Sequence, residues 1–198
     1  MKRIVLLAML APAALLTGCA TPAYVSPVEV TRFTAPQAVL GSGLIAVLPG
    51  PGEQADSWDY AAFQAAVAQE LARLGYSVVT GGARQVATVN VERVVERAGA
   101  RRSPVNVGVG GSTGSYGSGV GVGVGINLGG GRPAEQIDTE LRVSIFPAGG
   151  TEALWEGRAR FTATANSDYA DQRAAAAKLA GALFAGFPGR SGETIEVR

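Results

Sequence analysis

Two acidic side chains in a strongly alternating segment, Asp138 and Glu140, are the residues best placed for acid–base chemistry. They fall on the same face of the expected strand, where they could approach each other. Glycoside hydrolases use two carboxylates about 5–9.5 Å apart across a cleft. The strand pairing that we expect instead places an arginine opposite each carboxylate, which would lower both pKa values and prevent general-acid use. We therefore predict that the protein is not an enzyme, with a glycan-processing hydrolase as the less favoured alternative.

Other catalytic and ligand-binding groups are scarce. The chain has no histidine, the commonest general base and metal ligand. Residues 110–114 match the Gly-x-Ser-x-Gly nucleophile elbow, but that motif requires a following helix and a histidine, and here more glycine follows. Neither a dinucleotide fingerprint nor a phosphate-binding loop occurs in the glycine-rich part of the chain. These observations predict no metal site, no cofactor and no nucleotide partner.

The first 18 residues have the pattern of a secretion signal. Residues 2–3 are basic, and residues 4–16 form an uncharged apolar run of 13 residues. A membrane-spanning helix needs about 20 apolar residues, so this run is too short to cross a bilayer stably. We predict that residues 1–18 are removed as a signal peptide.

Cys19 is the only cysteine in the chain, so no internal disulfide can form. Residues 16–19, Leu-Thr-Gly-Cys, resemble the bacterial lipobox. The resemblance implies cleavage between Gly18 and Cys19, a diacylglyceryl group on the Cys19 sulfur and usually an acyl group on the new amine. Two or more acyl chains anchor a protein stably. Ala20, where an aspartate would imply inner-membrane retention by resemblance to enterobacterial lipoproteins, favours the outer membrane.

The charge balance of the mature chain argues against one large class of partner. Removing 18 of 198 residues leaves 180, enough for one domain. Without Lys2 and Arg3 the chain has 15 basic and 16 acidic side chains, a net charge of −1. Nucleic-acid-binding domains usually carry a strongly basic face, so we predict no nucleic-acid partner.

Two segments have the spacing of amphipathic helices. Residues 57–74 place apolar side chains on one stripe, with Asp56 or Ser57 as the N-cap and Gly75 as the stop. Residues 167–184 form an alanine-rich second helix, which ends before Pro188. The expected inward side chains are Tyr60, Phe63, Val67, Leu71, Leu74, Ala176, Leu179, Leu183 and Phe187.

Seven further segments have strand patterns: 28–33, 44–48, 76–80, 86–97, 137–146, 154–163 and 194–197. The strand–helix–strand order over residues 44–80 favours a parallel pair, and a slip in alternation at Val94-Val95 indicates a bulge. We predict an α+β fold: a largely antiparallel mixed sheet with two helices packed on one face, plus a glycine-rich hairpin or loop. A lipidated tether over 19–27 and a single domain over 28–198, with a glycine-rich insertion at 105–131, complete the expected organisation.

The segments 137–146 and 154–163 predict their own pairing. An antiparallel register in which partner numbers sum to 298 places opposite charges together, whereas a slip by one residue would place charges opposite apolar side chains. Three pairs then form on the polar face: Arg142 with Glu156, Glu140 with Arg158, and Asp138 with Arg160.

Glycine supplies 12 of the 25 residues from Val107 to Gly131. Branched residues alternate with glycine or asparagine on both sides of a loop at 111–118, which is the period of a strand. The branched face of such a hairpin would pack on the core, and the bare glycine face would let another backbone approach closely. We expect a mobile hairpin or loop, with partner docking and self-assembly through exposed edges as alternatives.

Several elements, in order, resemble a group of small proteobacterial lipoproteins that share a domain of unknown function. After the lipobox come a helix ending in Leu-Gly-Tyr at 74–76, a long strand near residue 90, a glycine-rich stretch, Leu-Trp-Glu-Gly-Arg-Ala at 154–159 and a helix running into Phe-Pro-Gly at 187–189. The resemblance implies one lipoprotein domain on a membrane and brings no catalytic residues with it.

We therefore predict a non-catalytic, lipid-anchored outer-membrane lipoprotein that faces the periplasm and is a structural or protein-interaction component of the cell envelope. An accessory subunit of an envelope transport or assembly complex is the alternative. Its partners would be membrane lipid, through Cys19, and another envelope protein. The candidate interaction surface consists of Tyr116, Asp138, Glu140, Arg142, Glu156, Arg158 and Arg160.

Overall fold

The computed structural model describes residues 22–54, 57–96, 105–112, 119–126 and 134–198. Its contacts divide the chain into two compact units. One unit includes the two glycine-rich strands, and the other comprises residues 23–98 and 134–198. The second unit contains a seven-stranded sheet and two α-helices.

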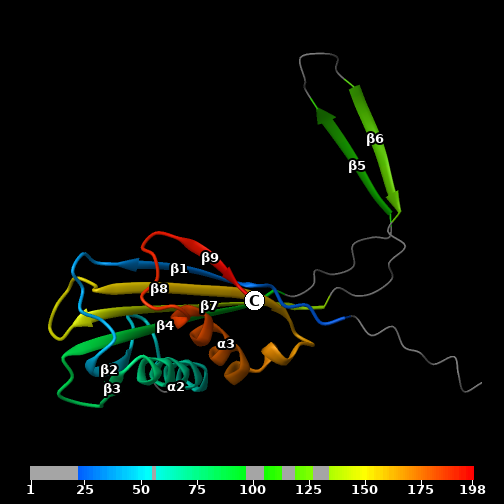
Figure 1. The fold of residues 1–198 in the computed structure, drawn as a ribbon. Helices are drawn as coiled ribbons and strands as arrows, with labels where there is room; N and C mark the ends of the chain where they lie inside the picture. Colours follow the sequence, from blue (N-terminus) through cyan, green and yellow to red (C-terminus); the bar gives the residue numbers. More distant parts are fainter. Residues whose placement is uncertain (1–21, 55–56, 97–104, 113–118, 127–133) are drawn as a thin grey trace, which may run out of the picture. The chain divides into compact units, whose positions relative to one another are not determined.

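The sheet is mixed and largely antiparallel (Figure 1). Its strands are β1 (Val28–Thr34), β2 (Gly43–Pro49), β3 (Tyr76–Val78), β4 (Gln85–Glu96), β7 (Gln136–Pro147), β8 (Trp155–Thr164) and β9 (Thr194–Val197). They are ordered β3-β2-β4-β7-β8-β1-β9 across the sheet. β2 is parallel to β3 and β4, and the other neighbours are antiparallel. The predicted parallel pairing within residues 44–80 is therefore confirmed.

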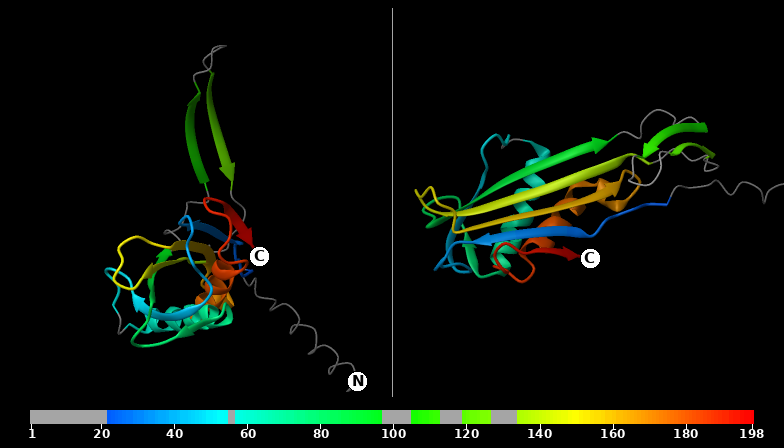
Figure 2. Two further views of the ribbon diagram at one scale, coloured as in Figure 1. Left: turned by 60° about the vertical axis from the view of Figure 1, so that its left-hand side comes forward. Right: turned by 90° about the horizontal axis from the view of Figure 1, so that it is seen from above.

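Two α-helices lie against the same face of the sheet (Figures 1 and 2). α2 (Trp58–Arg73) begins after Ser57, whose side chain accepts a hydrogen bond from the Tyr60 backbone N–H. α3 (Gln172–Phe184) begins after Asp171, whose carboxylate accepts from two backbone N–H groups. A short 3₁₀ turn, η2 (Asp168–Ala170), precedes α3. The backbone of Asp171 between them is extended, so the two do not form one continuous helix. The predicted α+β fold is confirmed.

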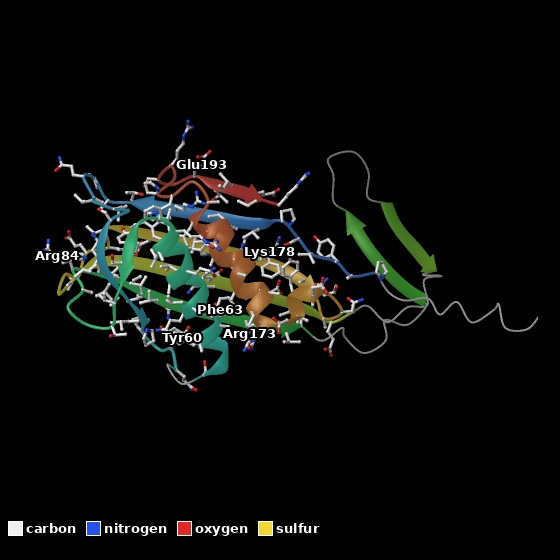
Figure 3. All side chains as sticks on the ribbon, turned by 60° about the horizontal axis from the view of Figure 1, so that its bottom comes forward. Tyr60, Phe63, Arg84, Arg173, Lys178 and Glu193 are labelled. Carbon is white, nitrogen blue, oxygen red and sulfur yellow. The ribbon has the colours of Figure 1, made fainter. Side chains whose placement is uncertain are left out.

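The core lies between the helices and the sheet. Figure 3 shows Tyr60 and Phe63 on α2, and together with Val67 and Leu71 they are at most 1% exposed. This is the stripe that helical spacing predicts. Trp155 of β8 stacks on Phe184 of α3 at 5.4 Å between ring centroids, and its indole N–H donates to the Pro188 carbonyl at 2.9 Å. These contacts join the sheet, α3 and the segment that follows α3.

Two arginines reach into the helix-covered side, and each binds main-chain carbonyls. The Arg32 guanidinium donates to the carbonyls of Ala182 and Leu183 in the last turn of α3, both at 2.9 Å. Such carbonyls have no partner within their own helix, and a cation suits the negative end of the helix dipole. Burial lowers the pKa of Arg32 from its ordinary value. Arg93 of β4 donates in the same way to the Ala170 carbonyl of η2.

The register between β7 and β8 corrects the predicted one by two residues. Partner numbers sum to 300 rather than 298, so Glu140 faces Arg160 and Arg142 faces Arg158. A shift of two residues leaves every side chain on its predicted face. The charged face is therefore where the alternation places it, whereas the three predicted facing pairs are wrong.

The loop between β7 and β8 accounts for the shift. The Gly150 N–H donates to the Pro147 carbonyl at 2.9 Å and closes a turn at the end of β7. The chain rejoins the ladder only at Leu154, whose N–H donates to the Ile145 carbonyl at 2.7 Å. The connection is thus longer than the alternation of charges indicates.

The predicted bulge at Val94-Val95 is also wrong. β4 pairs with β7 without interruption from Gln85 opposite Pro147 to Glu96 opposite Gln136. The alternation slips there because both valines are exposed, at 46% and 52%. An apolar residue on each face at a strand end needs no extra backbone residue.

The glycine-rich strands form a separate two-stranded antiparallel sheet. β5 (Val105–Ser112) pairs with β6 (Gly119–Ile126). The register places Val107 opposite Val124 and Gly108 opposite Gly123. Part of the predicted loop at 111–118 lies outside the described residues, and packing of the branched face on the core stays a prediction.

Candidate interaction surface

The face of the sheet opposite the helices carries most of the charged side chains of the strands. Cross-strand neighbours form rows that run from β9 through β1, β8 and β7 to β4. One row consists of Glu196, Glu29, Arg160, Glu140 and Glu92. The next row consists of Thr194, Thr31, Arg158, Arg142 and Asn90. We refer to these two rows, with Asp138 and Glu156 in the rows on either side, as the open face.

Ion pairs link the rows across the open face. Glu140 contacts Arg142 of its own strand and Arg158 of β8, the latter at 3.0 Å. Arg142 also lies 3.5 Å from Glu92 of β4. Because Glu140 reaches both arginines of the next row, it offsets the repulsion between Arg142 and Arg158, which face each other directly.

A fourth ion pair extends the charged surface to β1. Arg160 of β8 contacts Glu29 at 2.5 Å. On the same surface, a hydrogen bond of 2.8 Å between the hydroxyls of Thr31 and Thr194 links β1 to β9. Within the four rows, six carboxylates and three guanidiniums leave a net charge of −3.

Two open grooves lie on this face. The first, of about 520 Å³, is lined by Tyr24 and by five carboxylates and one guanidinium, those of Glu29, Glu92, Asp138, Glu140, Glu196 and Arg160. The second, of about 570 Å³, is lined by Phe33, Glu156 and the three arginines of the open face. One groove is therefore acidic and the other presents guanidinium groups beside an aromatic side chain that is 53% exposed.

The two carboxylates with catalytic potential both have partners. Glu140 lies between two guanidinium groups, and Asp138 accepts a hydrogen bond from the Thr162 hydroxyl. Glycoside hydrolysis requires one carboxyl group that donates a proton and a second that faces it across a cleft. Among the described residues, no group of three or more His, Cys, Asp or Glu side chains is arranged to hold a metal ion.

The structure brings together six of the residues predicted to form the interaction surface. Asp138, Glu140, Arg142, Glu156, Arg158 and Arg160 all lie on the open face. Tyr116 lies outside the described residues, as do Gly18 and Cys19 of the predicted cleavage and lipid site. None of the helices in the described part of the chain has the length and apolarity that a bilayer-crossing helix requires.

Sequence reasoning missed the three glutamates that other strands add to the surface, Glu29, Glu92 and Glu196. They reach it because β1, β4 and β9 flank the β7–β8 pair, although they are distant in sequence. The alternation of each strand indicated an exposed glutamate. That all three share one surface depends on the order of the strands in the sheet, and no local pattern in the sequence predicts that order.

The family of the chain follows from comparison with known sequences. The profile of a domain of unknown function, DUF4136, matches residues 45–189. The chain belongs to this family. The DUF4136 match runs from β2 to beyond α3 and includes all three arginines of the open face, whereas β1 and β9, which carry Glu29 and Glu196, lie outside it. The predicted domain of unknown function is confirmed.

Other similarities of this DUF4136 chain are partial or distant. An uncharacterized protein of Zymomonas mobilis is 37% identical over 65 residues, which cover 33% of this chain and 24% of that protein. The chain thus matches only about a quarter of the length of this curated relative.

Two solved structures resemble the DUF4136 chain at low identity. A PDZ domain protein from Parabacteroides distasonis is 12% identical with a TM-score of 0.51, covering 88% of this chain and 38% of that one. A PelC dodecamer from Paraburkholderia phytofirmans is 13% identical with a TM-score of 0.45, covering 83% and 99%. The first likeness supports the fold alone.

Proposed function

We propose that this DUF4136 protein is a non-catalytic lipoprotein, anchored to the outer membrane through Cys19 and facing the periplasm, that docks another envelope protein on its open face. The observation that carries the proposal is the ordered pair of charged rows on a face that the described helices leave uncovered. The excess of three carboxylates favours a partner that presents basic side chains. An accessory subunit of an envelope transport or assembly complex would use the surface in the same way.

The arrangement of the charged groups supports a binding role over a catalytic one. The carboxylate of Glu140 already accepts from two guanidinium groups, and that of Asp138 accepts from a hydroxyl. Charges held in such pairs give specificity and orientation to an interface. We expect the purified protein to release no fragments from peptidoglycan, and any loss of function in Asp138→Asn or Glu140→Gln to accompany weaker capture of the partner. Release of glycan fragments by the wild-type protein that both variants abolish would favour a hydrolase.

The anchor is tested by replacing the cysteine. We expect Cys19→Ala to abolish labelling by radioactive fatty acid and to release the protein from outer-membrane fractions. Mass spectrometry of the wild-type protein should place the mature N-terminus at Cys19. A mature N-terminus elsewhere, or unchanged fractionation of Cys19→Ala, would contradict lipid anchoring.

Docking on the open face is tested by photo-crosslinking in cells. A photoreactive amino acid at Thr31 or at Ser144 replaces a small polar side chain of the open face, and one at Ala177 on the exposed surface of α3 is the matched control. We expect the same partner to be captured from both open-face positions and not from Ala177. Glu29→Lys combined with Glu196→Lys should reduce capture, because it reverses two charges of the acidic row. Equal capture from all three positions would contradict the proposal.

A further inference from the structure

β9 forms one edge of the seven-stranded sheet, and among the described residues no strand pairs with its outer side (Figure 1). An edge strand presents a row of unpaired N–H and C=O groups, to which another chain can add as a strand. Proline residues and bulges commonly prevent such pairing. β9 has the sequence Thr-Ile-Glu-Val, without proline, and its four residues pair with β1 without a bulge.

The opposite edge of the sheet is protected in two ways. β3, the outermost strand there, spans only three residues. Beyond it on β2, the carbonyl of Val47 accepts a hydrogen bond from the Gln64 side chain of α2 at 2.9 Å. Short edge strands and covering helices both hinder the addition of a strand. Of the two edges, β9 is therefore the one that is open to pairing.

The hydrogen bonds of β1 show which of its residues bond to β9. The Ala35 N–H donates toward β8, to the Leu154 carbonyl at 3.0 Å. The Arg32 carbonyl instead accepts from the N–H of Gly192, on the β9 side, at 2.8 Å. In an antiparallel ladder, hydrogen-bonded and non-hydrogen-bonded residue pairs alternate. The even-numbered residues of β1 therefore bond to β9, and the odd-numbered ones bond to β8.

The same alternation orients the main chain of β9. Val30, an even-numbered residue, pairs with Ile195, so Ile195 bonds to β1. Val197, two residues further along β9, points the same way. The N–H and C=O groups of Thr194 and Glu196 therefore point to the free edge, where the described residues offer them no ladder partner.

A strand added to this edge would meet a different surface on each of its faces. On the open face it would lie beside Glu196, which pairs with Glu29 in the acidic row, so a basic side chain fits there. On the helix-covered side it would lie beside Ile195 and Val197, which are only partly buried against the core. Apolar side chains of the added strand would complete their burial.

A groove of about 430 Å³ lies beside Val197 on the helix-covered side, lined also by Lys178 and Gly181 of α3 and by Arg198. The Lys178 ammonium, labelled in Figure 3, lies 5.1 Å from the centroid of the Tyr169 ring. No Asp or Glu side chain in the described part of the chain lines the groove or forms an ion pair with either cation. A Cβ at Gly181 would meet nothing within 4 Å, so the wall there is open. The groove thus suits an apolar side chain with a carboxylate beside it.

We propose that a segment of the partner adds as a strand to the free edge of β9. This inference rests on the proposed function and names the contact that the partner makes. The segment alternates between basic side chains toward the open face and apolar side chains, with one carboxylate, toward the groove. In this mode of recognition, main-chain hydrogen bonds give affinity and alternate side chains give specificity. A second copy of this chain fits less well, because pairing β9 with β9 would bring Glu196, Lys178 and Arg198 of both copies, and thus like charges, into one interface.

The test uses the purified full chain and a short synthetic peptide that alternates lysine with valine and carries one glutamate at a valine position. Amide hydrogen exchange, measured by NMR, follows the N–H groups of β9 one by one. We expect the peptide to slow exchange at Thr194 and Glu196 by about tenfold or more. Exchange at Ile195 and Val197, which already bond to β1, should change little. The same peptide with N-methyl groups along its pairing edge should have no effect.

Variants of β9 and α3 separate the edge from the fold. Glu196→Pro removes an N–H that β1 does not use, so it should weaken peptide binding about fivefold more than Glu196→Gln, with thermal unfolding unchanged. Ile195→Pro removes a bond to β1 and should lower the unfolding midpoint instead. Lys178→Gln should weaken binding of the peptide several-fold, but not binding of an analogue with glutamine in place of its glutamate. Equal binding by Glu196→Pro and Glu196→Gln would contradict strand addition.

The outcomes in cells separate this inference from the proposed function. Equal capture of a partner from Thr31 and Ser144 in the Glu196→Pro and Glu196→Gln proteins would overturn strand addition alone. No capture from either position would overturn the proposed function itself. Slow exchange at Thr194 and Glu196 in the protein without peptide would also overturn strand addition by a partner. The edge would then be covered by a second copy if the protection rises with protein concentration, and by the chain itself if it does not.

Discussion

The two faces of the seven-stranded sheet use charged side chains in opposite ways. On the helix-covered side, Arg32 and Arg93 bind main-chain carbonyls, and Arg32 is only 5% exposed. On the open face, carboxylates and guanidiniums pair with one another in rows that remain partly exposed. Exposed pairs contribute little to stability. The comparison indicates that contacts on the helix-covered face stabilise the fold. The charged side chains of the open face contribute little to stability and remain available for binding.

The largest difference between the faces is expected from truncating the core. Phe63→Ala removes a ring that is fully buried between α2 and the sheet, and should lower the free energy of unfolding by about 3–5 kcal/mol. Glu156→Ala on the open face should change it by less than about 0.5 kcal/mol. Urea denaturation of both variants measures the contrast, and similar losses would break it.

Two arginines on opposite faces provide the next comparison. Arg32→Met keeps the apolar stem but leaves the carbonyls of Ala182 and Leu183 without their donor, at a cost of about 2 kcal/mol. Arg158→Met removes an exposed pair with Glu140 and should cost less than about 1 kcal/mol. If Arg158→Met proved the more destabilising in thermal unfolding, the open face would have a structural role that we do not assign to it.

A matched pair of glycines sharpens the packing argument. A Cβ at Gly157 would lie 2.3 Å from the Trp155 ring and 2.8 Å from Leu183, so Gly157→Ala should cost about 1–3 kcal/mol. A Cβ at Gly181 of α3 meets nothing within 4 Å, so Gly181→Ala should stabilise the helix by about 0.5–1 kcal/mol. Opposite shifts in the denaturation midpoint are expected, and shifts of the same sign would contradict this account.

The smallest effect at neutral pH is expected at Tyr60. Burial, with a further contribution from Glu53, raises the pKa of Tyr60 to about 12, and the described residues offer its hydroxyl no hydrogen-bond partner. Between about pH 10 and about 12 the unfolded chain releases this proton and the folded chain keeps it, so stability falls as pH rises. Tyr60→Phe should be nearly neutral at pH 7 and should weaken this alkaline loss. Denaturation measured at increasing pH tests the difference, and equal slopes would contradict the assignment.

Local patterns predicted the elements well, because they report on burial. The stripe from Tyr60 to Leu71 and the alternation of β7 and β8 require only that one face meets a core. The predicted β7–β8 register was wrong by two residues, because oppositely charged side chains can also pair diagonally across two strands. Glu140 does contact Arg158, but its facing neighbour is Arg160. Burial of Arg32 had a signal, since it shares the parity of Val28 and Val30. The joining of Glu29, Glu92 and Glu196 had none, because it depends on strand order.

The position of β1 has a mechanical consequence. β1 is the strand that immediately follows the N-terminal segment, and it lies between β8 and β9, with six registered residue pairs on one side and four on the other. A force applied to the N-terminal segment along the strand would load both ladders in shear, so that many hydrogen bonds resist together instead of opening one by one. The guanidinium of Arg32 would pass part of the same load to α3. A strand placed in this way can bear tension that is applied through the N-terminal segment.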